Sequence, residues 1–178
     1  MSTKQHTLKS AICFSGKGLH TGAQVTMNAT PAPANYGIVF KRVDIEGSPE
    51  IPALCDYVTD TSRGTTIEKG GCRVSTIEHI LSALWTMGVD NAIVEIDAAE
   101  TPIMDGSARE YALAILDAGI EEQEAERVFY NVTEKKVFKI EDKGVEITIY
   151  PDDSFSASVQ VDYNSKVIGN QYATFNPE

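Results

Sequence analysis

Two predicted amphipathic helices, separated by one short strand, constrain the fold of this chain more than any other feature. In the first helix, apolar residues recur at the i, i+3, i+4, i+7, i+8 spacing of a helical stripe, namely at Ile77, Ile80, Leu81, Leu84 and Trp85. Ser75 and Glu78 have the spacing of a capping box, and Gly88 can end the helix in a left-handed conformation. The sequence therefore predicts one helix between Ser75 and Gly88.

The second predicted helix repeats this pattern. Ser107 and Glu110 again have the spacing of a capping box. The apolar face consists of Ala108, Tyr111, Ala112 and Ile115, and Gly119 provides the stop. A short apolar strand at residues 91–96 and a loop at residues 101–106 are expected between the two helices.

Strand patterns dominate the chain before the helices. They lie at residues 7–14, 23–29, 38–43 and 51–58, and a further strand follows the polar loop at residues 59–66. Together with the helices they predict an α+β fold over residues 1–120. We expect a two-layer sandwich, in which a mostly antiparallel sheet carries both helices on one face.

The last third of the chain reads differently. Residues 121–127 are acidic and lack an apolar stripe, which predicts a linker between domains. Strand patterns resume at residues 127–132, 136–140, 145–150 and 155–163, with a hairpin turn at residues 142–144. Because no helix pattern follows, we interpret residues 128–178 as the first strands of a second, truncated domain. They form an incomplete repeat of the first unit.

Composition excludes several classes of protein. The 178 residues are 42% hydrophobic and carry a formal net charge of -11, which suits a folded core and argues against a nucleic-acid partner. Cys13, Cys55 and Cys72 are far apart, which predicts reduced thiols rather than a disulfide frame. The polar N-terminus has no signal-peptide pattern, and no apolar run reaches membrane-spanning length. We expect a cytoplasmic protein without an integral membrane segment.

Glu78 and His79 form the strongest chemical signal, and two interpretations are open. Glu78 can be only a capping carboxylate and His79 only a surface histidine, on a helix face shared with three small residues, Ser82, Ala83 and Thr86. Alternatively, the pair can supply the general base and one ligand of a zinc hydrolase. His6 and His20 are the other histidines, and no H-E-x-x-H pattern is present. These residues alone do not complete a metal site.

A glycine-rich loop at residues 15–22 contains His20. Its three glycines indicate a backbone that needs positive φ or close approach to another group. The spacing of Lys17 does not match a P-loop. His20 is therefore either a solvent-facing turn residue or a functional residue on a loop held by two strands.

Four motifs in order resemble one known family. They are Ser-Gly-Lys-Gly-Leu-His-Thr-Gly at residues 15–22, Ser-Thr-Ile-Glu-His at residues 75–79, Gly-Val-Asp-Asn at residues 88–91 and Pro-Ile-Met-Asp-Gly-Ser-Ala at residues 102–108. The chain resembles UDP-3-O-acyl-N-acetylglucosamine deacetylase, the zinc amidase of lipid A synthesis in Gram-negative bacteria, over nearly its whole length. Residues 15–18 and 170–174 also resemble deacetylases fused to a 3-hydroxyacyl-carrier-protein dehydratase.

This resemblance implies a two-domain fold with the active site between the domains. It implies that His79 binds one zinc ion, that Glu78 is the catalytic base and that His20, the second catalytic candidate, lies near the active site in the glycine loop. Arg63 and Gly64 fall where the family's loop approaches the zinc, so the resemblance implies that they shape the acyl or sugar contact. The substrate is a UDP-acylglucosamine. The other two ligands, in a His-x-x-x-Asp motif, the general-acid His and a substrate-binding Lys belong to the remainder of the second domain, which is expected beyond Glu178.

The sequence leaves three functional hypotheses open. The protein is a zinc deacetylase, the chain alone is a non-catalytic folding or binding fragment, or it is a sugar-nucleotide-binding module without hydrolysis. Zinc content, amidase activity and sensitivity of binding to chelators distinguish them. The residues Asp105, Gly106 and Ser107 of the last motif are also explained by a simple turn and helix cap.

Overall fold

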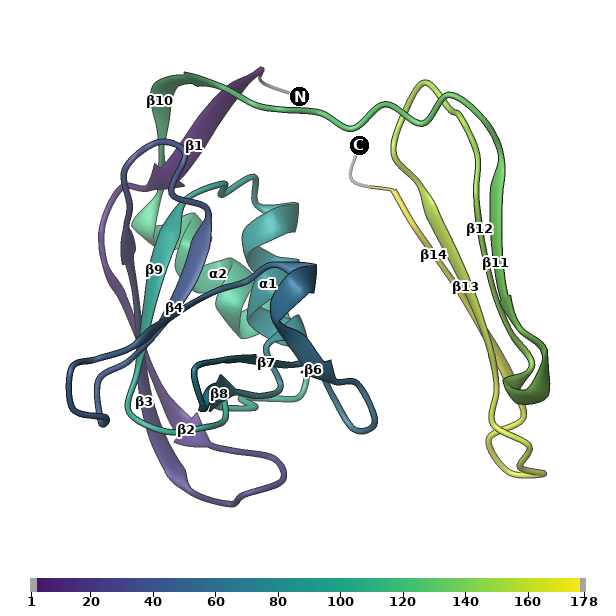
Figure 1. Cartoon of the computed structure of the whole chain (residues 1–178), viewed down its shortest axis with the longest axis horizontal. Coiled ribbons are helices and arrows are strands. Elements are labelled where there is room, and N and C mark those ends of the chain that lie inside the picture. Colours follow the sequence, from purple (N-terminus) through teal and green to yellow (C-terminus); the bar gives the residue numbers. More distant parts are fainter. Residues whose placement is uncertain (1–2, 177–178) are drawn as a thin grey trace. The chain divides into compact units, whose positions relative to one another are not determined.

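The structure is a computed structural model that describes residues 3–176. It divides into two compact units, one ending at Arg127 and the other beginning at Val128. The first contains two α-helices and mostly antiparallel strands, so the predicted α+β class is confirmed (Figure 1).

A five-stranded sheet forms one layer of the first unit. Its strand order is β2-β3-β9-β4-β5. Neighbours are antiparallel except β4 and β9, which run parallel. The strands are β2 Ile12–Lys17, β3 Gln24–Pro31, β9 Ala92–Ile96, β4 Ile38–Arg42 and β5 Glu50–Pro52. The glycine-rich segment predicted at residues 15–22 thus begins within β2, which includes residues 15–17, and its remainder connects β2 to the adjacent antiparallel strand β3.

The predicted strand at residues 51–58 is wrong over part of its length. Strand β5 ends at Pro52, and a short 3-10 helix, η1 (Cys55–Tyr57), interrupts the segment. A separate three-stranded sheet follows, made of β6 Val58–Asp60, β7 Thr66–Lys69 and β8 Cys72–Val74. The connection between β6 and β7, residues 61–65, reaches the start of the first α-helix, as described below.

The predicted linker at residues 121–127 is corrected by the structure. Strand β10 (Ile120–Glu126) pairs antiparallel with β1 (Lys4–Leu8), so these residues belong to the first unit. The strand has no apolar pattern because most of its side chains are exposed. Its polar Gln123 anchors it instead, by donating to the Ala32 carbonyl at 2.9 Å and accepting from the Asn91 amide at 2.8 Å.

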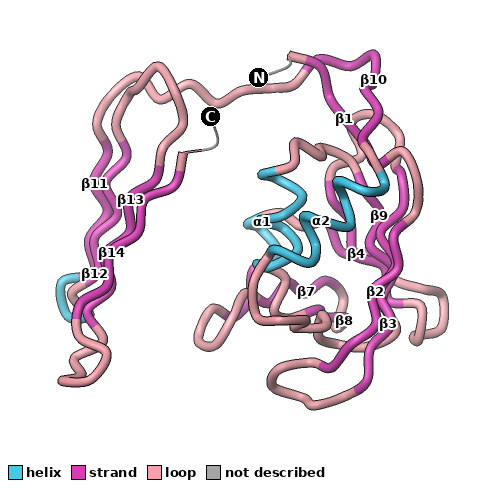
Figure 2. The backbone as a smooth tube through the Cα atoms, turned by 180° about the vertical axis from the view of Figure 1, so that it is seen from behind, coloured by secondary structure: helices cyan, strands magenta, loops and turns pink. Residues whose placement is uncertain are grey.

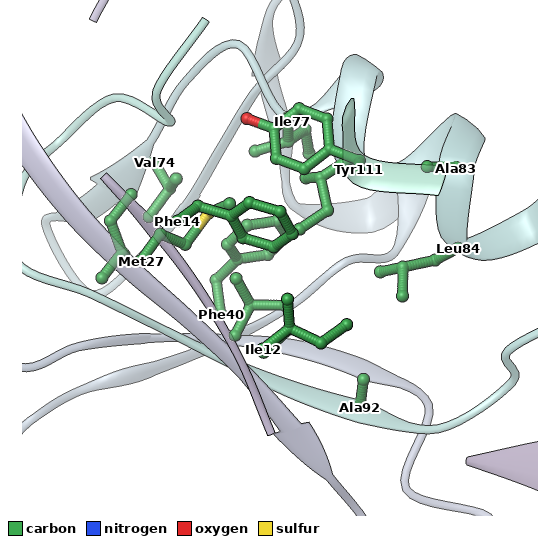
Figure 3. Close-up of a cluster of buried hydrophobic side chains, with 14 of the residues drawn as sticks. Ile12, Phe14, Met27, Phe40, Val74, Ile77, Ala83, Leu84, Ala92 and Tyr111 are labelled. Atoms are coloured by element: carbon green, nitrogen blue, oxygen red, sulfur yellow. The ribbon is translucent and has the colours of Figure 1, made fainter. Parts of the chain in front are cut away.

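Both helices lie on one face of the five-stranded sheet, α1 at Glu78–Thr86 and α2 at Arg109–Ala118 (Figures 1 and 2). Between them and the sheet lies the core, where the rings of Phe14 and Tyr111 meet edge to face, with centroids 4.8 Å apart (Figure 3). Each fully buried large side chain of this kind contributes roughly 1.5–3 kcal/mol to stability.

The buried face of α1 differs from the predicted stripe. Ile77, Ile80 and Leu84 are buried as expected, but Trp85 is 50% exposed. Ala83, expected on the opposite face, is buried instead. Helix α1 packs against α2 as well as against the sheet, so the arc that it buries is displaced from the sequence stripe.

The C-terminal ends of both helices agree with the prediction. At α1 the Gly88 N–H donates to the Trp85 carbonyl and the Val89 N–H to the Leu84 carbonyl, which is the Schellman pattern, with Gly88 at φ 78°. At α2 the chain leaves the helix at Gly119, φ 75°. Neither helix, at 9 and 10 residues, could cross a membrane.

The second unit consists of two β-hairpins over its described residues, 128–176. One pairs β11 (Lys136–Ile140) with β12 (Val145–Ile149), and the other pairs β13 (Ala157–Asp162) with β14 (Asn170–Phe175). A 3-10 turn, η2 (Glu141–Lys143), followed by left-handed Gly144 connects the first pair, so the predicted hairpin is confirmed. The strand expected at residues 127–132 is absent from the described segment. None of these residues is buried, because each two-stranded hairpin leaves both of its faces uncovered.

Candidate functional site

The glycine-rich loop holds His20 at an exposed position between β2 and β3. The Gly18 N–H donates to the Ala23 carbonyl at 2.9 Å, and the Gly22 N–H donates to the Gly18 carbonyl at 3.0 Å. Gly18 cannot be replaced without a shift, because a Cβ atom there would lie 2.5 Å from Glu100 Oε2. The glycines therefore let the loop close over a carboxylate beneath it.

The capping box predicted at the start of α1 is not formed. Ile77 is the N-cap residue and has no side-chain cap. The Ser75 hydroxyl donates to the Ala99 carbonyl at 3.1 Å, and the Glu78 carboxylate accepts the Thr65 N–H through Oε2 at 2.9 Å. Thr76, at φ 60°, turns the backbone between Ser75 and the helix. The interpretation of Glu78 as only a capping residue is therefore wrong.

Glu78 has the features of an available carboxylate. It is half-buried in the first turn of α1, where the helix dipole favours negative charge. Within residues 3–176, no hydrogen bond is made to its Oε1 atom. That oxygen lies beside Gly64, where a Cβ atom would come within 3.0 Å of it.

His20 and Glu78 meet the same short segment from two sides. His20 Nε2 lies 3.0 Å from the Arg63 carbonyl oxygen, and Glu78 Oε2 accepts the N–H of Thr65, two residues later. Because a carbonyl oxygen can only accept, this contact requires a proton on Nε2. The structure thus brings His20 and Glu78 together around residues 63–65, although they are 58 positions apart in the sequence.

His79 follows Glu78 on α1 and is half-buried. Among the residues that the structure describes, none forms a hydrogen bond with its imidazole, although its backbone carbonyl accepts the Ser82 hydroxyl at 2.9 Å. Both ring nitrogens are therefore available to a ligand. The helix neighbours expected beside it are not all alike, since Ser82 and Thr86 are exposed and Ala83 is buried.

A pocket of about 460 Å³ opens beside this segment. His20, Arg63 and Gly64, all singled out from the sequence, line it, whereas Glu78 and His79 do not. The other lining residues, which the sequence did not single out as site residues, are mostly hydroxyl-bearing or charged: Thr21, Asp60, Ser62, Thr66, Arg73, Ser75, Thr76 and Ala99. They come from four separate stretches of chain, so no single sequence motif could have identified the set.

Glu100 is a further residue that the sequence did not single out. It is fully buried (0% exposed) in the loop after β9, and it accepts hydrogen bonds from the backbone of His20 and Thr21 and from the Thr21 and Thr76 hydroxyls. Burial raises the pKa of this carboxyl, but the hydrogen bonds outweigh burial and hold the pKa below its usual value. Nothing in the local pattern marks Glu100 as buried.

Asp105 and Ser107 form a local turn. The backbone N–H and the hydroxyl of Ser107 both donate to Asp105 Oδ1, at 2.9 and 2.8 Å, and Ser107 Oγ accepts the Arg109 N–H at 3.1 Å. The Ser107 hydroxyl therefore accepts one first-turn N–H of α2, although the N-cap position itself is Ala108, which has no side-chain cap. The reciprocal bond expected from Glu110 is not formed, since Asp105 takes the Ser107 N–H.

The described part of the chain does not provide a complete metal site. No group of three or more His, Cys, Asp or Glu side chains within residues 3–176 could hold a metal ion. A catalytic zinc uses three protein ligands, and this region offers one imidazole, His79, next to a carboxylate. The described residues can therefore supply one ligand of such a zinc site but not the full set of three.

Comparison with known proteins gives a consistent result. The family model for LpxC, UDP-3-O-acyl N-acetylglycosamine deacetylase, matches residues 5–178. A bifunctional enzyme LpxC/FabZ of Bacteroides thetaiotaomicron is 46% identical over 171 residues, which cover 96% of this chain and 37% of that protein. A UDP-3-O-acyl-N-acetylglucosamine deacetylase of Teredinibacter turnerae is 46% identical over 164 residues, 92% of this chain and 54% of the relative.

A third relative, the deacetylase of Myxococcus xanthus, is 42% identical over 170 residues, 96% of this chain and 54% of that protein. The chain thus spans about half the length of the two deacetylases and a smaller share of the bifunctional enzyme. The four motifs, the family match over residues 5–178 and the identity to these relatives lead to one conclusion: this chain belongs to the LpxC family of UDP-3-O-acyl N-acetylglycosamine deacetylases.

Proposed function

We propose that the complete protein hydrolyses the N-acetyl amide of a UDP-linked 3-O-acyl-N-acetylglucosamine and releases acetate, as a zinc-dependent step of lipid A synthesis. Membership of the family and the names of the relatives support the reaction class. One structural observation carries the proposal. Glu78 is not used to cap its helix and shares the segment at residues 63–65 with His20.

In this proposal Glu78 is the general base. Its carboxylate takes a proton from the attacking water at one oxygen, while the Thr65 N–H holds the other oxygen in place. His20, with a proton on Nε2 and a position on the wall of the pocket, is placed to contact the substrate.

His79 is proposed as one ligand of a single zinc ion. Its imidazole is free of hydrogen bonds within the described chain, and it follows the proposed base directly on the helix. When bound, zinc would polarise the amide carbonyl and lower the pKa of a water molecule. We propose that the remaining ligands and the acid that protonates the leaving amine come from parts of the protein other than residues 3–176.

The cellular setting belongs to the same proposal. A nucleotide-linked sugar substrate suits the cytoplasm. The cysteines Cys13, Cys55 and Cys72 are all free thiols, which is compatible with a reducing compartment.

Replacement of Glu78 by Gln in the complete protein tests the base assignment. We expect kcat to fall about 100- to 10,000-fold, the usual contribution of a general base, with zinc content unchanged. The matched control is Glu110→Gln, because Glu110 occupies the first turn of the other helix. Amide hydrolysis by the purified variants, with metal analysis of each, gives the result. Equal rates for the two variants would contradict the proposal.

A sugar-nucleotide-binding module without hydrolysis is the alternative that the incomplete donor set favours. It predicts substrate binding that a chelator does not change and no acetate release by the complete protein. Removal of zinc followed by its return separates the two functions, since only the deacetylase loses and regains turnover.

A further inference from the structure

Glu100 is buried where a carboxylate is costly unless it is well solvated by the protein. It lies in the loop between β9 and α2, and no salt bridge to it occurs among residues 3–176. Neutral donors satisfy it instead. Burying an anion costs free energy unless hydrogen bonds compensate for it. The groups that donate to Glu100 therefore show which parts of the chain it holds together.

The partners of Glu100 come from two separate parts of the candidate site. On the glycine loop, the His20 N–H donates to Oε1 at 2.9 Å, and the Thr21 N–H and hydroxyl donate to Oε2 at 2.8 and 2.7 Å. On the segment before α1, the Thr76 hydroxyl donates to Oε1 at 3.1 Å. One carboxylate therefore joins the loop of His20 to the residue two positions before Glu78.

The backbone around Glu100 strengthens the second connection. Ser75 and Glu100 form a parallel β-bridge, in which the Ser75 N–H donates to the Ala99 carbonyl at 2.9 Å and the Thr101 N–H to the Ser75 carbonyl at 3.1 Å. The Thr101 hydroxyl also donates to the Thr76 carbonyl at 2.5 Å. Thr76 is held at φ 60°, a conformation that a β-branched residue adopts only when its surroundings impose it.

The glycine loop is built to admit this carboxylate. A Cβ atom at Gly18 would lie 2.5 Å from Glu100 Oε2 and 3.0 Å from its Cδ atom. No side chain fits there while Glu100 keeps its position. The sequence of the loop and the buried acid are therefore adapted to each other.

We propose that Glu100 is a positioning residue that sets the place of His20 relative to Glu78 and His79. Its catalytic relevance rests on the function proposed above, but its structural role does not. Bonds to an ionised acceptor are roughly twice as strong as neutral ones, so four of them hold both segments in one arrangement. His20 can then keep its contact with the Arg63 carbonyl while Glu78 keeps the Thr65 N–H.

The test is NMR of the 178-residue chain with Glu100→Gln. Glutamine keeps the shape of the Glu100 side chain, but its NH₂ group would face N–H and hydroxyl groups that can no longer all donate to it. We expect the His20 and Thr21 amides to exchange with solvent about tenfold faster or more. We also expect the imidazole signals of His20 and His79 and the Thr65 amide signal to shift. The His6 imidazole, which lies on β1 beside Arg127, serves as an internal reference that does not move.

Asp97→Asn is the matched control, because the Asp97 carboxylate accepts one backbone N–H, that of Thr26 at 2.7 Å, without touching the glycine loop. It should leave all three imidazole signals in place. If Glu100→Gln gives the same spectra as this control, the proposal is overturned. The measurement does not depend on turnover, so it stands apart from the failure or success of the deacetylase assignment.

Thr21→Val decides the matter if Glu100→Gln does not fold. Thr21 is exposed, and the change removes one hydroxyl bond to Glu100. A role confined to the loop would shift His20 alone. Shifts that extend to the His79 imidazole and the Thr65 amide support the proposal, and their absence overturns it.

Discussion

The starts of the two helices share one sequence pattern and use it in opposite ways. At α2, the bonds of Ser107 stay local, to Asp105 and Arg109. At α1, Ser75 donates to Ala99 and Glu78 accepts from Thr65, which lie 24 and 13 positions away. The same Ser-x-x-Glu spacing thus gives bonds within a local turn at one helix and tertiary contacts at the other.

The difference has a structural cause. Ser75 is held in a β-bridge with Glu100, and the positive φ of Thr76 intervenes before the helix begins, so the Ser75 hydroxyl does not reach the first-turn N–H groups. Glu78 is therefore released from capping. The side chains of the predicted capping box bond to distant residues instead of to the helix start. These tertiary contacts fix the position of Glu78, the proposed base.

The largest expected effect beyond that of Glu78 itself comes from Gly64→Ala compared with Gly106→Ala. A Cβ atom at residue 64 would press on Glu78 Oε1, at 3.0 Å, whereas at residue 106 it would meet nothing within 4 Å. Both glycines have positive φ, 154° at Gly64 and 84° at Gly106, so alanine is strained at either position. We expect kcat of the complete protein to fall for the first change only, and by less than the roughly 100-fold cost of a 1 Å misplacement, because Glu78 needs to move by only a few tenths of an ångström.

The readout for this pair is the rate of amide hydrolysis, with thermal melting of both variants to show that each folds. Similar rates for the two would mean that the position of Glu78 beside residue 64 does not matter for turnover.

An intermediate effect is expected when each serine is replaced by Asp. At residue 107 an aspartate keeps an acceptor for the Arg109 N–H but loses the hydroxyl bond to the exposed Asp105 carboxylate and repels it, so Ser107→Asp should cost about 0.5–1 kcal/mol. Ser75→Asp removes the donor to the Ala99 carbonyl and sets a carboxylate against it, which should cost about 1–3 kcal/mol. Urea unfolding of the 178-residue chain measures both. If the two substitutions changed the free energy of unfolding equally, the bond from Ser75 to the Ala99 carbonyl would not distinguish the start of α1 from that of α2.

The smallest effects concern acid stability. The Ser107 N–H and hydroxyl hold the pKa of Asp105 below its usual value, and hydrogen bonds outweigh burial to do the same for the pKa of Glu100. A depressed folded-state pKa gives stability that is present above the unfolded-state pKa, about 3.8 for Asp and 4.5 for Glu, and is lost as the pH falls through the folded value.

Both Asp105→Asn and Glu100→Gln should therefore flatten the loss of stability between about pH 5 and about pH 3, as measured by urea midpoints. We expect the flattening to be greater for Glu100, which is buried and joins two segments, than for exposed Asp105. The reverse order would indicate that the start of α1 depends less on its buried acid than the start of α2 depends on its local turn.

Much of the fold follows from sequence periodicity. The presence and ends of both helices were predicted because Gly88 and Gly119 mark local stops that need no knowledge of the rest of the chain. Strand β10 was missed because an edge strand with mostly exposed side chains has no apolar alternation, and its partner β1 lies more than 100 positions earlier. The exposure of Trp85 was missed because packing against α2 displaced the buried arc.

The sequence by itself determined the family, the α+β class and the candidates His20, Glu78 and His79, because motifs and spacings are local properties of the chain. Tertiary structure alone decided what these residues do to one another. It directed Glu78 to Thr65 and His20 to Arg63, and it buried Glu100 beneath the glycine loop. The physical reason is that a buried carboxylate and a helix start must find hydrogen-bond donors wherever the fold provides them, and in this protein those donors lie far away in the sequence.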